Sequence, residues 1–193
     1  MEQFKKITST TVPFEKINVD TDQIVPKQFL KLINKTGFGK YLFFNWRFDA
    51  NEKPIQSFIL NDPKYKNSKI LITLDNFGCG SSREHAVWAL QDYGFSVIIS
   101  PSFADIFYSN CFKNGLLPIT LDPQIVHKLL KTKSEIEVDL ECQTIKTNGE
   151  TIPFEIDEYH KNNLINGFDE ITLTLKNDDK ISDYEKKSTI SSL

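Results

Sequence analysis

The residue types that could do chemistry gather in one short stretch, Gly78 to His85, which reads Gly-Cys-Gly-Ser-Ser-Arg-Glu-His. It combines a glycine turn with two hydroxyls and a guanidinium. Ser81 and Glu84 have the spacing of a capping box, which predicts that Ser81 begins a helix. Unpaired backbone N–H groups and the positive end of the helix dipole would then stabilise an anionic substrate group, or an anionic Ser81.

The same residues also have a purely structural interpretation, because glycines and a serine are common where a strand turns into a helix. Arg83 favours the functional one, since an arginine in the first turn of a helix opposes the dipole and is expected to hold an anion. Ser82 is either a second hydroxyl at the substrate or part of the helix start. His85 could be a base, but exposure or ordinary hydrogen bonding is the simpler expectation.

Strands and helices that alternate along the middle of the chain must position this stretch. Such an order favours an α/β fold with a largely parallel core and right-handed crossovers. Asp122 and Pro123 have the order of a helix cap and a first helical residue. The expected elements are a strand at 69–77, a helix at 82–93, a strand at 95–100, a helix at 103–113 capped by Ser102, a strand at 116–121 and a helix from 123.

The remainder of the chain predicts a hairpin extension and a polar end. Asn148-Gly149 is a strong hairpin signal. The expected elements here are strands at 135–145 and 151–156, a short helix near 158–166 and a strand at 170–176. We therefore expect one domain over residues 1–176, followed by a polar tail or docking helix over residues 177–193.

Composition narrows the class of function. The chain of 193 residues is long enough for one packed domain, and no linker or repeat divides it. A formal net charge of -3 and a pI near 5.7 give no basic footprint for nucleic acid. No apolar run approaches the ~18 residues that span a bilayer, and the N-terminus has no apolar export signal. A soluble cytoplasmic protein is expected.

The three cysteines, Cys79, Cys111 and Cys142, are odd in number and widely spaced, which argues against a disulfide framework. They also lack the clustered spacing of iron–sulfur ligands. Cys111 is expected in an apolar helix and Cys142 in a strand, both as core residues. Cys79 lies in the glycine turn, where partial exposure would make it redox-sensitive.

Four segments, in this order along the chain, carry a family resemblance: Val19–Leu30, Thr36–Phe48, the string GCGSSREHA from Gly78, and Ser102–Ile119. Together they resemble the small subunits of bacterial 3-isopropylmalate dehydratase (isopropylmalate isomerase). The resemblance implies the swivelling β/β/α fold found in the C-terminal domain of aconitase. It also implies a hydro-lyase that isomerises 2-isopropylmalate and 3-isopropylmalate via 2-isopropylmaleate in leucine biosynthesis.

The resemblance further implies a large-subunit partner that carries a [4Fe-4S] cluster, with the active site formed between the two subunits. No cofactor or metal is then expected on this chain, which would be inactive alone. Two alternatives remain: the small subunit of a sibling hydro-lyase of the citramalate or homoaconitate type, and a non-catalytic anion-binding regulatory module. A serine hydrolase is disfavoured, because the Gly-x-Ser-x-Gly elbow is missing.

Roles for three residues follow from the same resemblance. The serine that matches Ser81 is the catalytic base, as an alkoxide, and the arginine that matches Arg83 binds a substrate carboxylate. A glycine turn, a helix N-terminus and a guanidinium could stabilise such an alkoxide. Thr21-Asp22-Gln23-Ile24 resembles a Thr-Asp-His-Ile segment of the superfamily, which places Asp22 at the substrate; an Asx-turn or a cap is its alternative role.

The segment from Phe29 to Phe38 corresponds to a loop that faces the variable part of the substrate in related small subunits. Its apolar side chains would form a wall for an isopropyl group, or belong to the core. These side chains are Phe29, Leu30, Leu32 and Ile33. Arg47 is a further candidate clamp for a carboxylate, with a surface ion pair as its alternative role.

Overall fold

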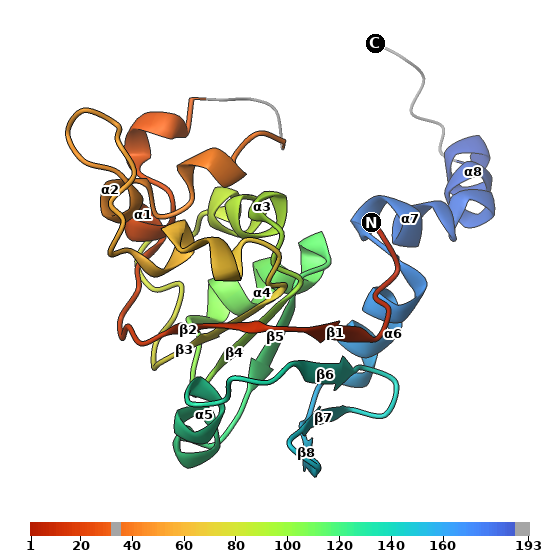
Figure 1. Ribbon diagram of the computed structural model, residues 1–193. Coiled ribbons are helices and arrows are strands. Elements are labelled where there is room, and N and C mark those ends of the chain that lie inside the picture. Colours follow the sequence, from red (N-terminus) through yellow and green to blue (C-terminus); the bar gives the residue numbers. More distant parts are fainter. Residues whose placement is uncertain (32–35, 188–193) are drawn as a thin grey trace.

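The computed structural model describes residues 1–31 and 36–187 (Figure 1). Its framework is a parallel sheet of order β2-β3-β4-β5 and an antiparallel sheet of order β1-β6-β7-β8. The strands are β1 (Ile7–Ser9), β2 (Thr11–Phe14), β3 (Ile70–Thr73), β4 (Val97–Ser100), β5 (Leu117–Thr120), β6 (Ile136–Asp139), β7 (Thr144–Thr147) and β8 (Glu150–Pro153). This arrangement confirms the expected α/β fold with a parallel core and a hairpin extension.

Helices cover both faces of the parallel sheet, with α3 and α4 on one side and α5 on the other (Figure 1). Helix α5 begins as predicted, because the Asp122 carboxylate accepts a hydrogen bond from the backbone N–H of Gln124. The helices are α1 (Thr21–Ile24), α2 (Phe44–Arg47), α3 (Glu84–Tyr93), α4 (Asp105–Asn114), α5 (Pro123–Leu130), α6 (Glu158–Asn166), α7 (Glu170–Leu175) and α8 (Asp178–Lys187). Short 3-10 turns lie at Lys27–Phe29, Gly39–Tyr41, Ile59–Asn61 and Pro63–Tyr65.

The two central strands of the parallel sheet are buried on both faces. Side chains alternate between the faces of a strand, so each strand contributes to two cores. Leu71 and Ile98 pack with the residues of α3 and α4. Their neighbours, Ile70 and Val97 among them, pack with α5 and the antiparallel sheet. This double burial explains why residues 69–77 read as a nearly continuous apolar run, although β3 itself ends at Thr73.

Two predictions near the C-terminus are wrong for local reasons. The strand expected at 170–176 is instead helix α7 (Glu170–Leu175), because the Asp169 side chain accepts a hydrogen bond from Thr172 N at 2.8 Å and caps a helix. Residues 135–145 form two strands separated by a turn, in which Gln143 has a positive φ of 51°. Cys142 lies in this turn and is exposed, so it is not a core residue.

The hairpin and the buried cysteine expected in this half of the chain are confirmed, but Ser102 does not cap α4: this helix begins at Asp105, with Ala104 in the N-cap position and without a side-chain cap. The hairpin at Asn148-Gly149 joins β7 to β8, with positive φ values of 47° and 78° at its two central residues. Cys111 is buried in α4 as expected. Residues 178–187 form α8, while residues 188–193 lie outside the described part. A boundary between two units at residue 176 stays a prediction.

Gly78 opens the candidate stretch in a conformation that needs glycine. Its φ is +78°, and an added Cβ would overlap the ring of Phe107. We expect Gly78→Ala to lower the free energy of unfolding by about 2–4 kcal/mol, from backbone strain and overpacking together. Gly149→Ala is the matched control, because Gly149 has the same φ but open space around it; its cost should be about 1 kcal/mol. Urea unfolding measures both, and equal losses would rule out the Phe107 contribution.

Candidate functional site

The candidate stretch lies beyond the carboxyl ends of the parallel strands, where ligands bind in open α/β sheets. The loop from Asn76 to Gly80 runs between residues 18–21 and residues 102–104. Parallel backbone bridges hold it on both sides: Asp20 with Cys79, and Phe77 with Phe103. The loop therefore continues the sheet in an irregular form and delivers Ser81 at its end.

Ser81 is exposed, and its hydroxyl does not cap the helix that follows. Helix α3 begins at Glu84, with Arg83 in the N-cap position and without a side-chain cap, so the predicted capping box is wrong. The reason is a tertiary contact: the Glu84 carboxylate accepts a hydrogen bond from Asn114 Nδ2 at 2.8 Å. Arg83 thus precedes the first turn of α3, and its charge does not oppose the dipole from inside the helix.

Arg83 joins the loop to α1. Its Nη1 donates to the Asp22 carboxylate and forms an ion pair with it, and its Nη2 lies 3.4 Å from Ser81 Oγ. The side chain of Arg83 is only 12% exposed, and that of Asp22 is 36% exposed. The structure therefore brings together the three residues Ser81, Arg83 and Asp22 that the sequence singled out.

The hydrogen bond from Arg83 is the main cause that lowers the pKa of the Asp22 carboxyl group. The positive charges of Arg83 and Lys27 act in the same direction, and burial opposes them. Lys27 Nζ lies 3.4 Å from the second carboxylate oxygen. Asp22 therefore stays ionised at neutral pH and holds the guanidinium in place.

Helix α1 owes its position to a capping box that sequence reasoning missed. The Asp20 carboxylate accepts from Gln23 N at 2.7 Å, and the Gln23 side-chain oxygen accepts from Asp20 N at 3.0 Å. The Asp-x-x-Gln spacing is a signal that could have found it. The cap belongs to Asp20, so the alternative role of Asp22 as a cap is wrong. Gln23, which replaces the histidine of the superfamily segment, is occupied by this cap.

Thr21 is a second residue that sequence reasoning missed. Its side chain is buried, and its hydroxyl donates to the backbone carbonyl of Ser81 at 3.0 Å. Its backbone N–H donates to the carbonyl of Cys79 at 2.9 Å. Two neighbouring residues of α1 thus act on the site in different ways: Thr21 orients the backbone of Ser81, and Asp22 orients the side chain of Arg83.

Phe29 and Leu30 follow α1 and are half-buried against the core beneath α3 and α4. The Phe29 ring stacks on Tyr41, with centroids 3.9 Å apart, and meets Phe44 edge-on at 4.9 Å. These contacts give both residues a packing role, and their role toward a substrate stays a prediction. Leu32 and Ile33 lie outside the described residues.

Arg47 is half-buried and bonded to structural groups. Its Nη1 donates to the carbonyls of Gly39 and Leu42, both at 3.3 Å, and its Nε donates to Asn61 Oδ1. It forms no ion pair with the acidic side chains that the structure describes, so the expected surface ion pair is wrong. Burial is the main cause that lowers its pKa.

His85 and Cys79 are placed as packing residues beside the site. The His85 ring contacts Phe38 and Trp88, with centroids 5.3 Å and 4.6 Å away, and burial lowers its pKa, which favours the neutral form. Burial, followed by the charge of Asp20, raises the pKa of the half-buried Cys79 thiol. A raised pKa disfavours the reactive thiolate at neutral pH.

Metal ligands do not converge in the part of the chain that the structure describes. Within residues 1–31 and 36–187, no group of three or more His, Cys, Asp or Glu side chains is arranged to hold a metal ion. Cys79 is half-buried in the loop, Cys111 is buried and Cys142 is exposed. Of the described helices, none is long and apolar enough to span a membrane.

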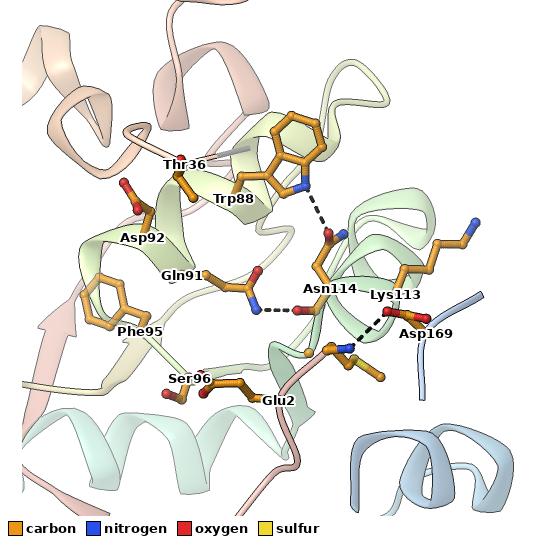
Figure 2. Close-up of a pocket in the computed structure, with 12 residues that line it drawn as sticks. Glu2, Thr36, Trp88, Gln91, Asp92, Phe95, Ser96, Lys113, Asn114 and Asp169 are labelled. Atoms are coloured by element: carbon orange, nitrogen blue, oxygen red, sulfur yellow. Dashed lines mark hydrogen bonds and ion pairs between the residues drawn. The ribbon is translucent and has the colours of Figure 1, made fainter. Parts of the chain in front are cut away.

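A separate hollow lies toward the other end of α3 (Figure 2). Gln91 Nε2 donates to the Asn114 carbonyl at 2.6 Å, and Trp88 Nε1 donates to Asn114 Oδ1 at 3.0 Å. The Met1 amino group pairs with the Asp169 carboxylate at 3.0 Å. The residues predicted from the sequence do not line this hollow, and these polar groups bond to one another, so we do not assign the chemistry to it.

Comparisons with known proteins show which family the chain resembles. The Aconitase C-terminal domain family matches residues 1–124, and the LeuD_N family matches residues 131–158. The 3-isopropylmalate dehydratase small subunit of Brevibacillus brevis is 51% identical over 193 residues, which cover 97% of this chain and 100% of the relative. That of Bacillus subtilis is 53% identical over 192 residues, with 97% and 96% covered. The crystal structure of 3-isopropylmalate dehydratase (leuD) from Methanocaldococcus jannaschii superposes with a TM-score of 0.67 at 26% identity, covering 94% of this chain and 99% of that one.

Proposed function

The chain belongs to the family of 3-isopropylmalate dehydratase small subunits, and we propose that Ser81 and Arg83 are its contribution to the shared active site. Together with a large subunit, the chain would form a lyase. This enzyme interconverts 2-isopropylmalate and 3-isopropylmalate via 2-isopropylmaleate in leucine biosynthesis. The names of the relatives favour this substrate over those of sibling hydro-lyases. A cytoplasmic location, expected from the sequence, is part of this proposal.

The arrangement of Ser81 and Arg83 is the observation that carries the proposal. Dehydration needs a base for the proton on the carbon next to a carboxylate, and a serine does this only as a stabilised alkoxide. The Arg83 guanidinium, 3.4 Å from Ser81 Oγ, supplies positive charge at that oxygen. The alkoxide would take the proton as the C–H electrons form the double bond and the hydroxyl leaves; in hydration, the Ser81 hydroxyl would return a proton.

Arg83 has a second task in this proposal. Asp22 engages Nη1 of the guanidinium, which leaves other N–H groups to bind a substrate carboxylate. Because Arg83 is almost buried, its orientation is set before the substrate arrives. Asp22 then acts on the substrate through Arg83, as a positioning residue. Ser82 is exposed next to Ser81 and remains a candidate for a further hydrogen bond to the substrate.

The remaining requirement is a Lewis acid for the departing hydroxyl. The donor set of this chain does not fit an iron–sulfur cluster, because its three cysteines occupy a loop, a buried helix and an exposed turn. We assign the Lewis acid to the large subunit, for which the family resemblance implies a [4Fe-4S] cluster. A site that opens toward another chain accords with the exposure of Ser81 and Ser82.

Reconstitution tests the proposed function. The chain, its large subunit loaded with iron under anaerobic conditions, and their mixture are assayed with 2-isopropylmalate, following the ultraviolet absorbance of 2-isopropylmaleate. We expect turnover only when the two subunits are mixed, and none from either subunit by itself. Turnover by the isolated chain without iron would contradict a shared site. A folded, iron-loaded mixture that turns over citramalate but not isopropylmalate would assign the chain to a sibling hydro-lyase.

The Asp22–Arg83 ion pair predicts a pH-dependent contribution to stability. The pKa of Asp22 is lower in the folded state, so the ion pair stabilises the fold above the ordinary carboxyl pKa of about 4; this contribution is lost as the pH falls through the lowered value. Since the pair is partly exposed, we expect Asp22→Asn to lose about 0.5–1 kcal/mol at pH 7 and a shrinking amount below pH 4. Urea unfolding across this range measures the effect. Glu15→Gln is the control at an exposed carboxylate, and it should show neither the loss of stability at pH 7 nor a change of that loss with pH. If the loss of unfolding free energy in Asp22→Asn were the same at every pH, the ion pair could not be its source.

A further inference from the structure

Two exposed isoleucines flank the loop from Asn76 to Gly80, which leads to Ser81. Ile17 is 60% exposed and follows β2, in the segment that leads directly to residues 18–21 on one side of the loop. Ile106 is 54% exposed and lies in the first turn of α4, directly after residues 102–104 on the other side. Side chains of this size gain free energy when a partner removes them from water.

The residues between the two isoleucines form a hydrogen-bonded rim. Asn76 Nδ2 donates to Asn18 Oδ1, and Asn76 N donates to Ser102 Oγ, both at 2.8 Å. Asn18 and Asn76 have positive φ values of 52° and 59°, a conformation that asparagine tolerates better than most residues. These hydrogen bonds hold the segments of Asn18, Asn76 and Ser102 in one arrangement before any partner binds. Such preorganisation lowers the entropic cost of association.

We call Ile17, Asn18, Asn76, Ser102 and Ile106 the rim surface, and we propose that it is a contact surface for the large subunit. This inference rests on the proposed function. The reaction needs the large subunit within reach of Ser81, and the rim segments are bonded to the loop that carries Ser81 on both sides. A chain that closes over Ser81 and excludes water must therefore approach these segments.

The composition of the rim surface suits such a contact. None of its five residues carries a charge, and the cores of protein interfaces are depleted of charged side chains. Two exposed carboxylates adjoin it: Asp75, which accepts a hydrogen bond from Ser102 Oγ at 3.5 Å, and Asp105, which precedes Ile106. They would belong to the polar edge of such a contact. Large exposed apolar side chains also occur on α7 and α8, including Ile171 at 72% exposure. Nothing in the structure shows what covers those helices, so Ile171 provides a matched control for an exposed isoleucine away from the site.

The test measures binding and turnover separately. The chain is labelled with a fluorophore at the exposed thiol of Cys142, and the iron-loaded large subunit is titrated while anisotropy is followed. We expect Ile17→Asp and Ile106→Asp each to raise the Kd by about tenfold or more, because a buried carboxylate without a partner is costly. Ile17→Leu, Ile106→Leu and Ile171→Asp should stay within about twofold. Circular dichroism confirms folding, and an acid in the first turn of α4 is favourable for the helix.

The outcomes separate this inference from the function on which it rests. Turnover of the two Asp variants should return to the wild-type value at saturating large subunit, which a catalytic lesion would not allow. Wild-type Kd values for both Asp variants, in a mixture that isomerises isopropylmalate, would overturn the rim surface and leave the proposed function standing. Equal weakening by Ile171→Asp would also overturn it. A wild-type chain that neither binds nor reacts would overturn the proposed function and the inference together.

Discussion

Replacing Ser81 with alanine is expected to lower kcat of the reconstituted enzyme by about 10²- to 10⁴-fold, the usual contribution of a positioned base. The free energy of unfolding should barely change, because Ser81 is exposed and its hydroxyl does not cap α3. A serine that served as a helix cap would instead cost about 1 kcal/mol when truncated. In Ser81→Ala, a catalytic role therefore predicts a large fall in kcat with an almost unchanged free energy of unfolding.

The measurement pairs steady-state kinetics with a thermal melt and a binding titration. Ser82→Ala is the matched control, because Ser82 is the neighbouring exposed hydroxyl and is not assigned to proton transfer. It should retain most of the turnover. Near-normal turnover by a fully assembled Ser81→Ala complex would remove the base assignment and favour the alternative of a non-catalytic anion-binding module.

Arg83→Lys is expected to lower kcat/KM by about 10²-fold, although the charge is kept. The planar guanidinium engages Asp22 through Nη1 while Nη2 points to Ser81 Oγ, and further N–H groups remain for a carboxylate. A lysine ammonium is a single point charge and cannot reproduce this fork. Losing one or two charge-assisted hydrogen bonds, at about 1.5–3 kcal/mol each, accounts for an effect of this size.

A double-mutant cycle shows whether Asp22 works through Arg83. Asp22→Asn should lower kcat/KM by a smaller factor, about tenfold, because the guanidinium remains but is held less firmly. If the two residues act as one unit, adding Asp22→Asn to Arg83→Lys should change little more. Fully additive losses would instead assign Asp22 an independent contact with the substrate. Wild-type kcat/KM for Arg83→Lys would exclude the carboxylate clamp.

Three strands of the parallel sheet, β3, β4 and β5, could be predicted because their signals are local, whereas β2 (Thr11–Phe14) was not predicted. Apolar runs for strands 69–77 and 95–100 alternate with helical periodicity, and Asp122-Pro123 and Asn148-Gly149 specify a cap and a turn within a few residues. Burial on both faces of the sheet gives these strands nearly continuous apolar runs. The strand expected at 170–176 failed because its β-branched residues were weighed above the Asp169 cap, which is equally local.

The predicted capping box failed for a different reason. Ser81 and Glu84 have the right spacing, but Asn114 binds the Glu84 carboxylate from the end of α4, thirty residues away in sequence. Cys142 and Arg47 likewise depend on neighbours that spacing does not reveal: a turn with Gln143 at positive φ, and the carbonyls of Gly39 and Leu42. In each case a tertiary contact or an unrecognised turn outweighed the local pattern.

By itself, the sequence determined the α/β core, the glycine turn and the residue types at the site, since these depend on periodicity, turn chemistry and side-chain chemistry within short windows. Only the tertiary structure decided that Asp22 orients Arg83, that Thr21 orients Ser81, and that Ser81 is not a helix cap. Asp22 and Arg83 are separated by 61 positions. In this fold their contact forms because the parallel strands bring the segments that follow their carboxyl ends to one edge, which is a property of the packed sheet and not of any local segment.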